Sequence, residues 1–357
     1  MLLTAISCSK QSSVAPILVL ATENEFGAYT GEILKAEGFN AFRMDSLSDP
    51  EIKLKYLKKF DLVILAESSL TTSQKDMFAL FVKKGGNLIA FKPDKKLSEV
   101  FGISEEAGSF EKAYLSVNAN SDITKGIIKE TIRLHVPVDK YKLRGGIKLA
   151  DLITEATGSS GLPGVVINNY GKGRAISFLY NLPKNIVYTR QGNYQFAGVE
   201  KDGIFGLRPM DLFTDGWVDT LKNTINQADE QMRLLTHCIE NLSKYSKPVP
   251  RFWYFPDSLK CLATLTNDGE NSTEAEFDPQ FADVDAKGAK MTLYVLETDK
   301  ISREWVTRWI SKGHEISGHP DNVKYAGNPD WKTMDSAIKF EGYSLSHHRL
   351  VNRVPAR

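Results

Sequence analysis

Apolar runs alternate with amphipathic segments over the first hundred residues, and this alternation predicts parallel strands separated by helices. The apolar runs are P-I-L-V-L-A-T from Pro16, F-D-L-V-I-L-A from Phe60 and N-L-I-A-F from Asn87. Helical patterns and one short strand pattern lie around them, the helices over residues 31–37, 51–58 and 73–84 and the strand over residues 39–44. Unbroken apolar runs flanked by helices are typical of parallel strands covered on both faces. We therefore predict an α/β fold with a doubly wound domain over residues 15–242.

Two later patterns complete this domain. The segment G-V-V-I-N-N-Y-G-K-G-R-A-I-S-F-L-Y-N-L contains two strand patterns around Gly171–Gly173, which predicts a β-hairpin. Residues 229–244 predict a helix whose apolar face carries Met232, Leu235, Ile239 and Leu242. In the earlier helix over residues 73–84, the spacing predicts an apolar stripe of Met77, Leu80 and Phe81.

A proline-rich segment separates this domain from the rest of the chain. Residues 243–257 read S-K-Y-S-K-P-V-P-R-F-W-Y-F-P-D, and such a segment cannot continue a helix. We expect a linker here, between the first domain and a second domain over residues 258–357. The aromatic residues Phe252–Phe255 either line a sugar site or pack against the next domain, and packing is favoured because aromatic side chains dominate buried area.

Composition and charge exclude several classes of function. The chain has 357 residues with a formal charge of +1, so no electrostatic feature favours nucleic acid or an anionic membrane surface. No stretch reaches the eighteen or so consecutive apolar residues of a membrane span. The three cysteines are too few and too scattered for a disulfide framework. We expect Cys238 and Cys261 to be small buried residues.

The third cysteine, Cys8, ends the apolar stretch L-L-T-A-I-S-C and precedes the polar run S-K-Q-S-S. This pattern resembles the end of a bacterial lipoprotein signal, although the basic region that usually comes first is missing. The resemblance implies lipid attachment at Cys8, with residues 1–14 as signal and tether. It also implies an exported protein, either periplasmic or anchored to the outer membrane. The alternative is a frayed end with a chance cysteine.

The order of strands over residues 17–102, together with the hairpin strand G-K-G-R-A-I-S-F, resembles the class I glutamine amidotransferase-like fold. Catalytic members of that fold place a cysteine on a sharp turn after a strand. The matching turn here is K-P-D-K-K, Lys92–Lys96, which contains neither cysteine nor serine. Ser68 and Ser69 follow the preceding strand without a G-x-S-x-G frame, and we expect them to cap a helix. The resemblance therefore implies a non-catalytic scaffold or ligand-binding module.

The second domain begins with patterns of a different kind. L-K-C-L-A-T-L-T-N-D-G-E, from Leu259 to Glu270, predicts a buried strand that ends in polar residues. A second strand, M-T-L-Y-V-L-E, is followed by the amphipathic helix S-R-E-W-V-T-R-W-I-S-K and then by G-H-E-I-S-G-H-P. The carboxyl edge of parallel strands is where barrels of this kind place their chemistry.

This order of motifs, from Leu259 to Val323, resembles the polysaccharide deacetylases related to nodulation-factor deacetylases. The resemblance implies a partial (β/α) barrel that binds a divalent metal, usually zinc, and hydrolyses acetyl groups on a glycan. It implies that Asp268 and His319 are metal ligands and that His314 is a framework residue. It also places Asn267 at the general-base position and Val323 at the position of a further ligand histidine.

Both departures from the motif have a chemical meaning. An amide cannot accept a proton from metal-bound water, so Asn267 removes the usual base. Two protein ligands are fewer than the three that catalytic zinc usually has. Asp321 and the pair His347–His348 are candidates for a further donor. Alternatively, His319, Pro320 and Asp321 form only a turn.

Two hypotheses about function follow. About a hundred residues remain after the linker, against the roughly 200 or more of a complete barrel, so we expect an incomplete deacetylase barrel. The first hypothesis is an exported carbohydrate-active protein related to these hydrolases of non-peptide carbon–nitrogen bonds, weakly active or inactive. The alternative is a non-catalytic module that binds a glycan or a partner.

Overall fold

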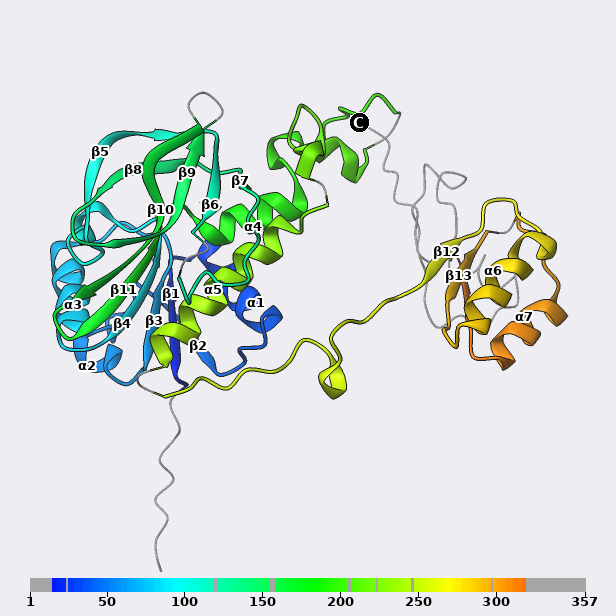
Figure 1. Cartoon of the computed structure of the whole chain (residues 1–357), viewed down its shortest axis with the longest axis horizontal. Helices are drawn as coiled ribbons and strands as arrows, with labels where there is room; N and C mark the ends of the chain where they lie inside the picture. The colour runs from blue at the N-terminus through cyan, green and yellow to red at the C-terminus, as the bar shows by residue number, and fades with distance from the viewer. Residues whose placement is uncertain are drawn as a thin grey trace, which may run out of the picture. The chain divides into compact units, whose positions relative to one another are not determined.

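The computed structural model describes residues 15–318, except 24, 119–120, 155–157, 205–206, 223, 245–246 and 297. The chain divides into two compact units (Figure 1). The first consists of Met1–Gly192 with Val218–Pro256, and the second of Asn193–Trp217 with Asp257–Arg357.

The first unit is built on a nine-stranded sheet with the order β2-β1-β3-β4-β11-β10-β9-β6-β7. Its strands, in sheet order, are Phe42–Ser46, Ile17–Ala21, Leu62–Leu65, Asn87–Phe91, Gly173–Phe178, Gly158–Tyr170, Ile147–Thr154, Ala113–Val117 and Ile132–Leu134. The strands from β2 to β11 run parallel, and those from β11 to β7 pair antiparallel. A separate antiparallel pair joins β5 (Ile103–Phe110) to β8 (Val138–Leu143).

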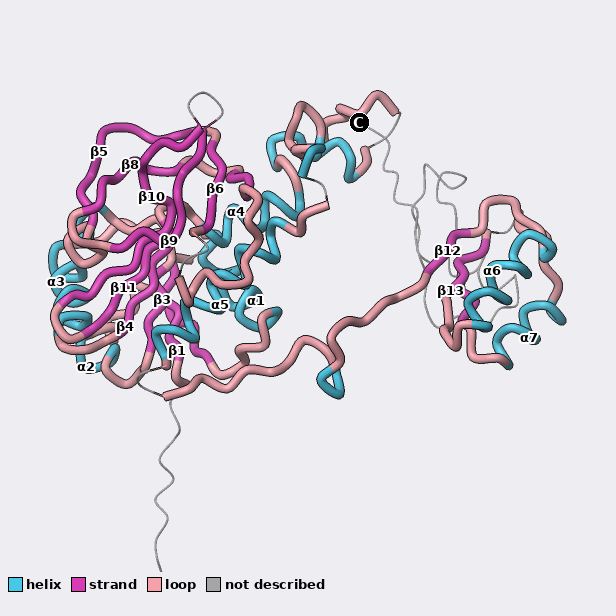
Figure 2. The backbone as a smooth tube through the Cα atoms, viewed as in Figure 1, coloured by secondary structure: helices cyan, strands magenta, loops and turns pink. Residues whose placement is uncertain are grey.

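Helices cover both faces of the parallel half of this sheet. They are α1 (Tyr29–Ala36), α2 (Leu54–Leu57), α3 (Thr72–Lys83), α4 (Leu182–Gln191) and α5 (Gln227–Ser243). Helices α2 and α3 lie on one face, and α1, α4 and α5 lie on the other (Figures 1 and 2). With both faces covered, the strand residues Ile17–Leu20, Leu62–Ile64 and Leu88–Phe91 are all fully buried. The predicted mixed α/β architecture is confirmed.

The two long helices of this unit differ in how well their sequences predict their buried faces. In α5, Met232, Leu235, Ile239 and Leu242 are all buried, as predicted. In α3, the buried residues are Phe78, Phe81 and Val82, whereas Leu80 is 38% exposed. Of the predicted stripe, Phe81 is buried as expected and Met77 is half-buried, whereas Leu80 was wrong, because Phe78 and Val82 take the remaining buried positions.

The carboxyl end of α5 is held by polar side chains of the sheet. Arg174 donates to the carbonyl oxygen of Asn241 at 2.7 Å and to that of Leu242 at 3.3 Å. Asn87 donates to the same Leu242 oxygen at 3.2 Å. The last carbonyl groups of a helix have no partner within the helix, so these bonds satisfy them and fix α5 on the sheet.

The predicted hairpin is confirmed, with Tyr170 paired to Gly173 across a two-residue turn. Gly171 has a φ of +63°, which favours glycine. A Cβ atom at this position would also lie 2.6 Å from the carbonyl oxygen of Lys83, at the end of α3.

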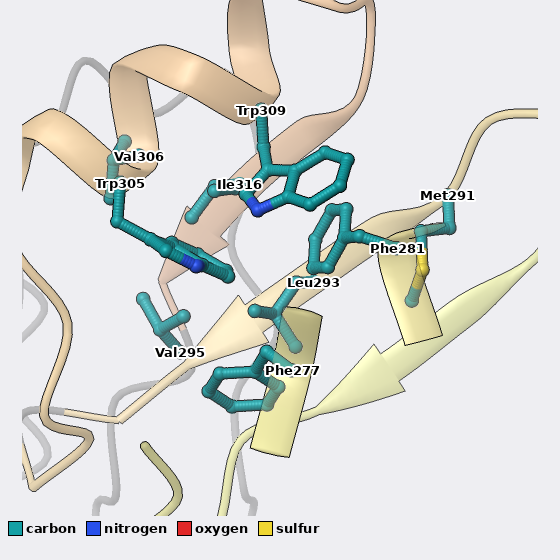
Figure 3. Close-up of a cluster of buried hydrophobic side chains, with 9 residues drawn as sticks. All are labelled: Phe277, Phe281, Met291, Leu293, Val295, Trp305, Val306, Trp309 and Ile316. Atoms are coloured by element: carbon teal, nitrogen blue, oxygen red, sulfur yellow. The ribbon is translucent and has the colours of Figure 1, made fainter. Parts of the chain in front are cut away.

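The second unit contains a three-stranded parallel sheet in the order β12-β13-β14, with strands Thr266–Asp268, Thr292–Val295 and Glu315–Gly318. Helices α6 (Glu274–Ala286) and α7 (Arg303–Ser311) connect them. Thr273 begins α6 with a capping box, and the Ser302 hydroxyl caps α7. Figure 3 shows the core of this unit, in which Phe281, Trp305 and Trp309 pack together between the helices and β13, with Trp305 edge-on to Phe281. The other segment of the unit holds the short helices η3 (Tyr194–Phe196) and η4 (Pro209–Phe213).

The segment before β12 differs from its prediction. Leu259, Leu262 and Leu265 are 46%, 63% and 41% exposed, and Cys261 is exposed as well. The buried strand predicted from Leu259 onward was therefore wrong, because only Thr266–Asp268 pairs with β13. Cys238 is buried as expected, and burial raises the pKa of its thiol.

Candidate functional site

Asp268 lies at the carboxyl end of β12, on the edge of the sheet where the sequence predicts a metal. In the register of the sheet it lies opposite Tyr294, which in turn lies opposite Ser317. Two strand spacings separate Asp268 from Ser317, or about 10 Å. His319 follows β14 closely but is outside the described residues, as are Asp321, Val323 and His347–His348. The Asp268–His319 metal site therefore stays a prediction.

Asn267, at the expected base position, is partly exposed and bound to the following helix. Its Nδ2 donates to Oε1 of Gln280 in α6 at 2.7 Å. An amide has no basic lone pair at neutral pH, so this side chain cannot take a proton from water. An aspartate could keep the contact, because Gln280 can present its amide nitrogen instead of its oxygen.

Asp299, whose role was not predicted from the sequence, joins the loops that follow β12 and β13. Its Oδ1 accepts from the Ser272 N–H and its Oδ2 from the Leu296 N–H, each at 2.7 Å. A Cβ atom at Gly269 would lie 1.9 Å from Asp299 Oδ2. The glycine after Asp268 thus leaves room for the carboxylate that holds this edge together. Nothing in the local sequence signals this role, because the two loops lie about thirty residues apart.

His314 is buried at the opposite, amino-terminal end of β14. Its ring packs edge-on against Phe281 and Trp309, and Nδ1 accepts from the Met291 N–H at 3.4 Å. Burial lowers the pKa of the His314 ring, and the Asp285 carboxylate, 3.5 Å from Nε2, opposes this shift. The framework role that the family resemblance implies for His314 stays a prediction.

An acidic cluster in the other segment of the second unit was also not predicted. Ligand atoms of Glu200, Asp202 and Asp211 lie within 4.8 Å of one another and could hold a metal. Asp211 is buried, and its carboxylate accepts hydrogen bonds from the backbone N–H groups of Arg208, Lys201 and Asp202 at 2.6 to 3.0 Å. The hydrogen bond from Arg208 is the largest cause of the lowered pKa of Asp211. These carboxylates therefore organise their own loop.

A second candidate site lies at the carboxyl edge of the large sheet in the first unit. A cavity of about 420 Å³ is lined there by residues after β3, after β4 and from β8. Ser68 binds the Thr22 hydroxyl at 3.0 Å and donates to the carbonyl oxygen of Glu67. The expectation that the serine pair caps a helix was wrong, because Thr71 is the residue that caps α3.

The aromatic segment after α5 is anchored at one end of α1. Arg251 donates to the carbonyl oxygen of Glu37 at 2.6 Å, and the Tyr254 hydroxyl donates to the Glu37 carboxylate at 2.7 Å. Phe252 and Trp253 are 68% and 56% exposed. The choice between a sugar site and packing against a neighbouring domain stays open.

Membrane attachment through Cys8 also stays a prediction, since this residue is outside the described part of the chain. Among the described residues, no helix combines the length and the apolar character needed to cross a bilayer.

Comparison with known proteins identifies no family. No family model matches the chain, and no curated protein matches it. Solved structures with partial similarity include the β-galactosidase from Rahnella sp. R3 (18% identity, 46% of this chain, 28% of that chain, TM-score 0.38). Agd3, described as a novel carbohydrate deacetylase, is similar at 18% identity over 47% of this chain and 30% of that chain (TM-score 0.38). The cytoplasmic protein STM1381 from Salmonella typhimurium LT2 is 14% identical over 46% of this chain and 87% of that chain (TM-score 0.37). The chain spans less than a third of the galactosidase and of the deacetylase.

Proposed function

We propose that this chain is an exported carbohydrate-active protein whose second unit derives from the metal-dependent polysaccharide deacetylases and has weak or absent activity. The observation that supports this most is Asp268 at the carboxyl end of β12, next to an amide at position 267. In the proposal the first unit is a non-catalytic, amidotransferase-like module, and Cys8 carries the lipid anchor.

A divalent metal suits the donor atoms of this edge. Asp268 offers a carboxylate oxygen, and His319 would supply an imidazole nitrogen. When bound, such a metal polarises the acyl carbonyl and lowers the pKa of water. Because one carboxylate and one histidine are fewer than three ligands, we expect weak binding of the metal.

The residue beside Asp268 limits the chemistry. Deacetylation needs a group that takes a proton from water as it attacks the acyl carbon. Asn267 cannot do so, and loss of a general base costs about 10²- to 10⁴-fold in rate. The amide at position 267 also favours the alternative function, a module that binds a glycan or a partner without catalysis.

The test compares the full chain with three variants, Asp268→Ala, Asn267→Asp and the surface control Asp283→Ala. We expect less than one zinc per purified chain and no measurable acetate release from acetylated sugar oligomers. Asp268→Ala should lower zinc affinity further, whereas Asp283→Ala should not, since Asp283 is 70% exposed on α6. If any activity survives, Asn267→Asp should raise acetate release by about 10²-fold or more.

Two results would contradict the proposal. Stoichiometric zinc with metal-dependent turnover in the unchanged chain would show a working deacetylase with another base. Zinc affinity that is unchanged in Asp268→Ala would remove Asp268 from the metal site and with it the main support for deacetylase ancestry.

A further inference from the structure

The cavity in the first unit is built from the ends of parallel strands, the place where open α/β sheets bind ligands. Glu67 follows β3 and Lys92 follows β4, and both line the cavity with Asp139 of β8. Its volume of about 420 Å³ falls within the usual range for small-molecule sites.

Lys92 has a backbone conformation that needs an explanation. Its φ is +40°, in the left-handed region that costs an L-residue about 1–2 kcal/mol. Pro93 follows, and a residue before proline is ordinarily extended. The conformation is held by the Lys92 N–H, which donates to the carbonyl oxygens of Phe178 at 2.7 Å and Tyr180 at 3.1 Å. Such strain persists where the surroundings impose it, and it is concentrated at functional sites.

The strained turn directs the Lys92 ammonium into a fixed pair at the cavity wall. Its Nζ lies 2.9 Å from Glu67 Oε1, and the Asn181 amide donates to Glu67 Oε2 at 2.7 Å. Both Glu67 oxygens are therefore oriented from within the protein. The side chains of Lys92 and Glu67 are 28% and 38% exposed, so one face of the pair stays open to a ligand.

Asp139 adds an acceptor that the protein does not use. No hydrogen bond or ion pair of its carboxylate occurs among the described residues, although the side chain is partly buried in the cavity wall. Burial, opposed by the nearby Lys92 charge, raises the pKa of this carboxyl group. A partly buried carboxyl without a partner gains from a ligand that donates a hydrogen bond to it.

The charges around the cavity balance. Lys92, Lys95 and Lys96 line it together with Glu67, Asp94 and Asp139, three cations against three anions. A strongly anionic or cationic ligand would meet like charges at short range, whereas hydroxyl groups can donate to carboxylates and accept from ammonium groups in the same site.

We propose that this cavity binds a neutral, polyhydroxylated small molecule of about monosaccharide size. Lys92 donates to one hydroxyl oxygen of the ligand, and Glu67 and Asp139 accept from others. No aromatic side chain is among the described residues that line it, so recognition rests on hydrogen bonds and not on stacking. The proposal does not depend on a metal or on deacetylase chemistry in the second unit.

The experiment measures binding by the full chain with ligand-observed NMR and calorimetry. The probes are glucose, galactose and N-acetylglucosamine, with glucosamine and glucuronate as charged analogues of the same ring. We expect a neutral sugar to bind and both charged analogues to bind at least tenfold more weakly. Lys92→Ala and Asp139→Asn should each weaken binding about tenfold or more, whereas Lys55→Ala, an exposed lysine on α2, should leave it unchanged.

Three outcomes would overturn the proposal. If none of the neutral sugars binds at millimolar concentrations, the cavity holds only solvated ion pairs. If a sugar binds equally well to Lys92→Ala and Asp139→Asn, binding occurs elsewhere in the chain. If glucuronate or glucosamine binds more tightly than the neutral sugars, the charge argument fails. Each result stands apart from the zinc and acetate measurements, because those concern residues of the second unit.

Discussion

The left-handed conformation of Lys92 allows a quantitative test with two substitutions that remove the same side chain. Lys92→Gly and Lys92→Ala both break the ion pair with Glu67, which is part-exposed and worth less than about 1 kcal/mol. They differ only in the backbone. Alanine keeps the left-handed cost of about 1–2 kcal/mol. Glycine avoids this cost, but it loses more backbone freedom on folding than alanine does, which costs about 0.5–1 kcal/mol. We therefore expect Lys92→Gly to be the more stable of the two by about 1 kcal/mol.

The assay must report on the first unit alone, because the chain has two units. Urea unfolding read by hydrogen-exchange mass spectrometry on peptides from β3 and β4 meets this need. Lys92→Gly should have the higher urea midpoint with an unchanged slope, and both variants should bind sugar about tenfold or more weakly than the unchanged chain. Equal midpoints, or a more stable alanine variant, would refute strain at this residue. Lys55→Ala serves as the control and should match the unchanged chain.

Two further predictions concern other residues. Asp278→Ala should destabilise the second unit by about 1–2 kcal/mol in urea unfolding, because Asp278 accepts from Trp305 Nε1 at 2.6 Å and Trp309 Nε1 at 3.0 Å. The control Asp283→Ala, at an exposed position on the same helix, should have no measurable effect. If both variants lost the same stability, the two tryptophan hydrogen bonds would not be the cause. Burial, with a smaller contribution from a nearby cation, lowers the pKa of His135 from 6.5 to about 4, so an NMR titration should show its ring neutral at pH 5. Between pH 4 and 6.5 the unfolded chain then binds more protons at His135 than the folded chain does. This difference should make the first unit less stable as the pH falls from about 6.5 toward 4. A His135 ring that titrates near 6.5 would contradict this.

The part of the fold that could be predicted from sequence is the part set by local burial. Strands β1, β3 and β4 are apolar without interruption because helices cover both faces of the sheet, and this pattern is visible in a single segment. Strand β8 carries no such signal, because only Val138 and Tyr141 of its six residues are buried. For Leu259–Leu265 the apolar pattern misled, because an apolar run becomes a buried strand only where a neighbouring strand pairs with it.

In the candidate sites too, features set by one short segment could be predicted and features set by distant segments could not. The place of Asp268 at the carboxyl end of a strand could be predicted from the polar residues that follow the apolar run, whereas its metal-binding role stays a prediction. Asp299 could not, since its role depends on amides from two loops. The left-handed turn at Lys92 could not be predicted either, because carbonyl groups of Phe178 and Tyr180, nearly ninety residues later, impose it.

The two candidate sites share a pattern that bears on the choice between catalysis and binding. Each lies at the carboxyl edge of parallel strands, and each keeps polar groups in fixed positions. In the first unit, the strained turn after β4 presents an ammonium group that is already paired with Glu67, and this pair raises the pKa of Lys92 despite its partial burial. A protonated amine cannot act as a nucleophile. In the second unit, Asn267 presents an amide where a base would be needed. The Lys92 ammonium and the Asn267 amide can thus hydrogen-bond a ligand but cannot serve as nucleophile or general base, and at these two positions this supports the proposed binding function.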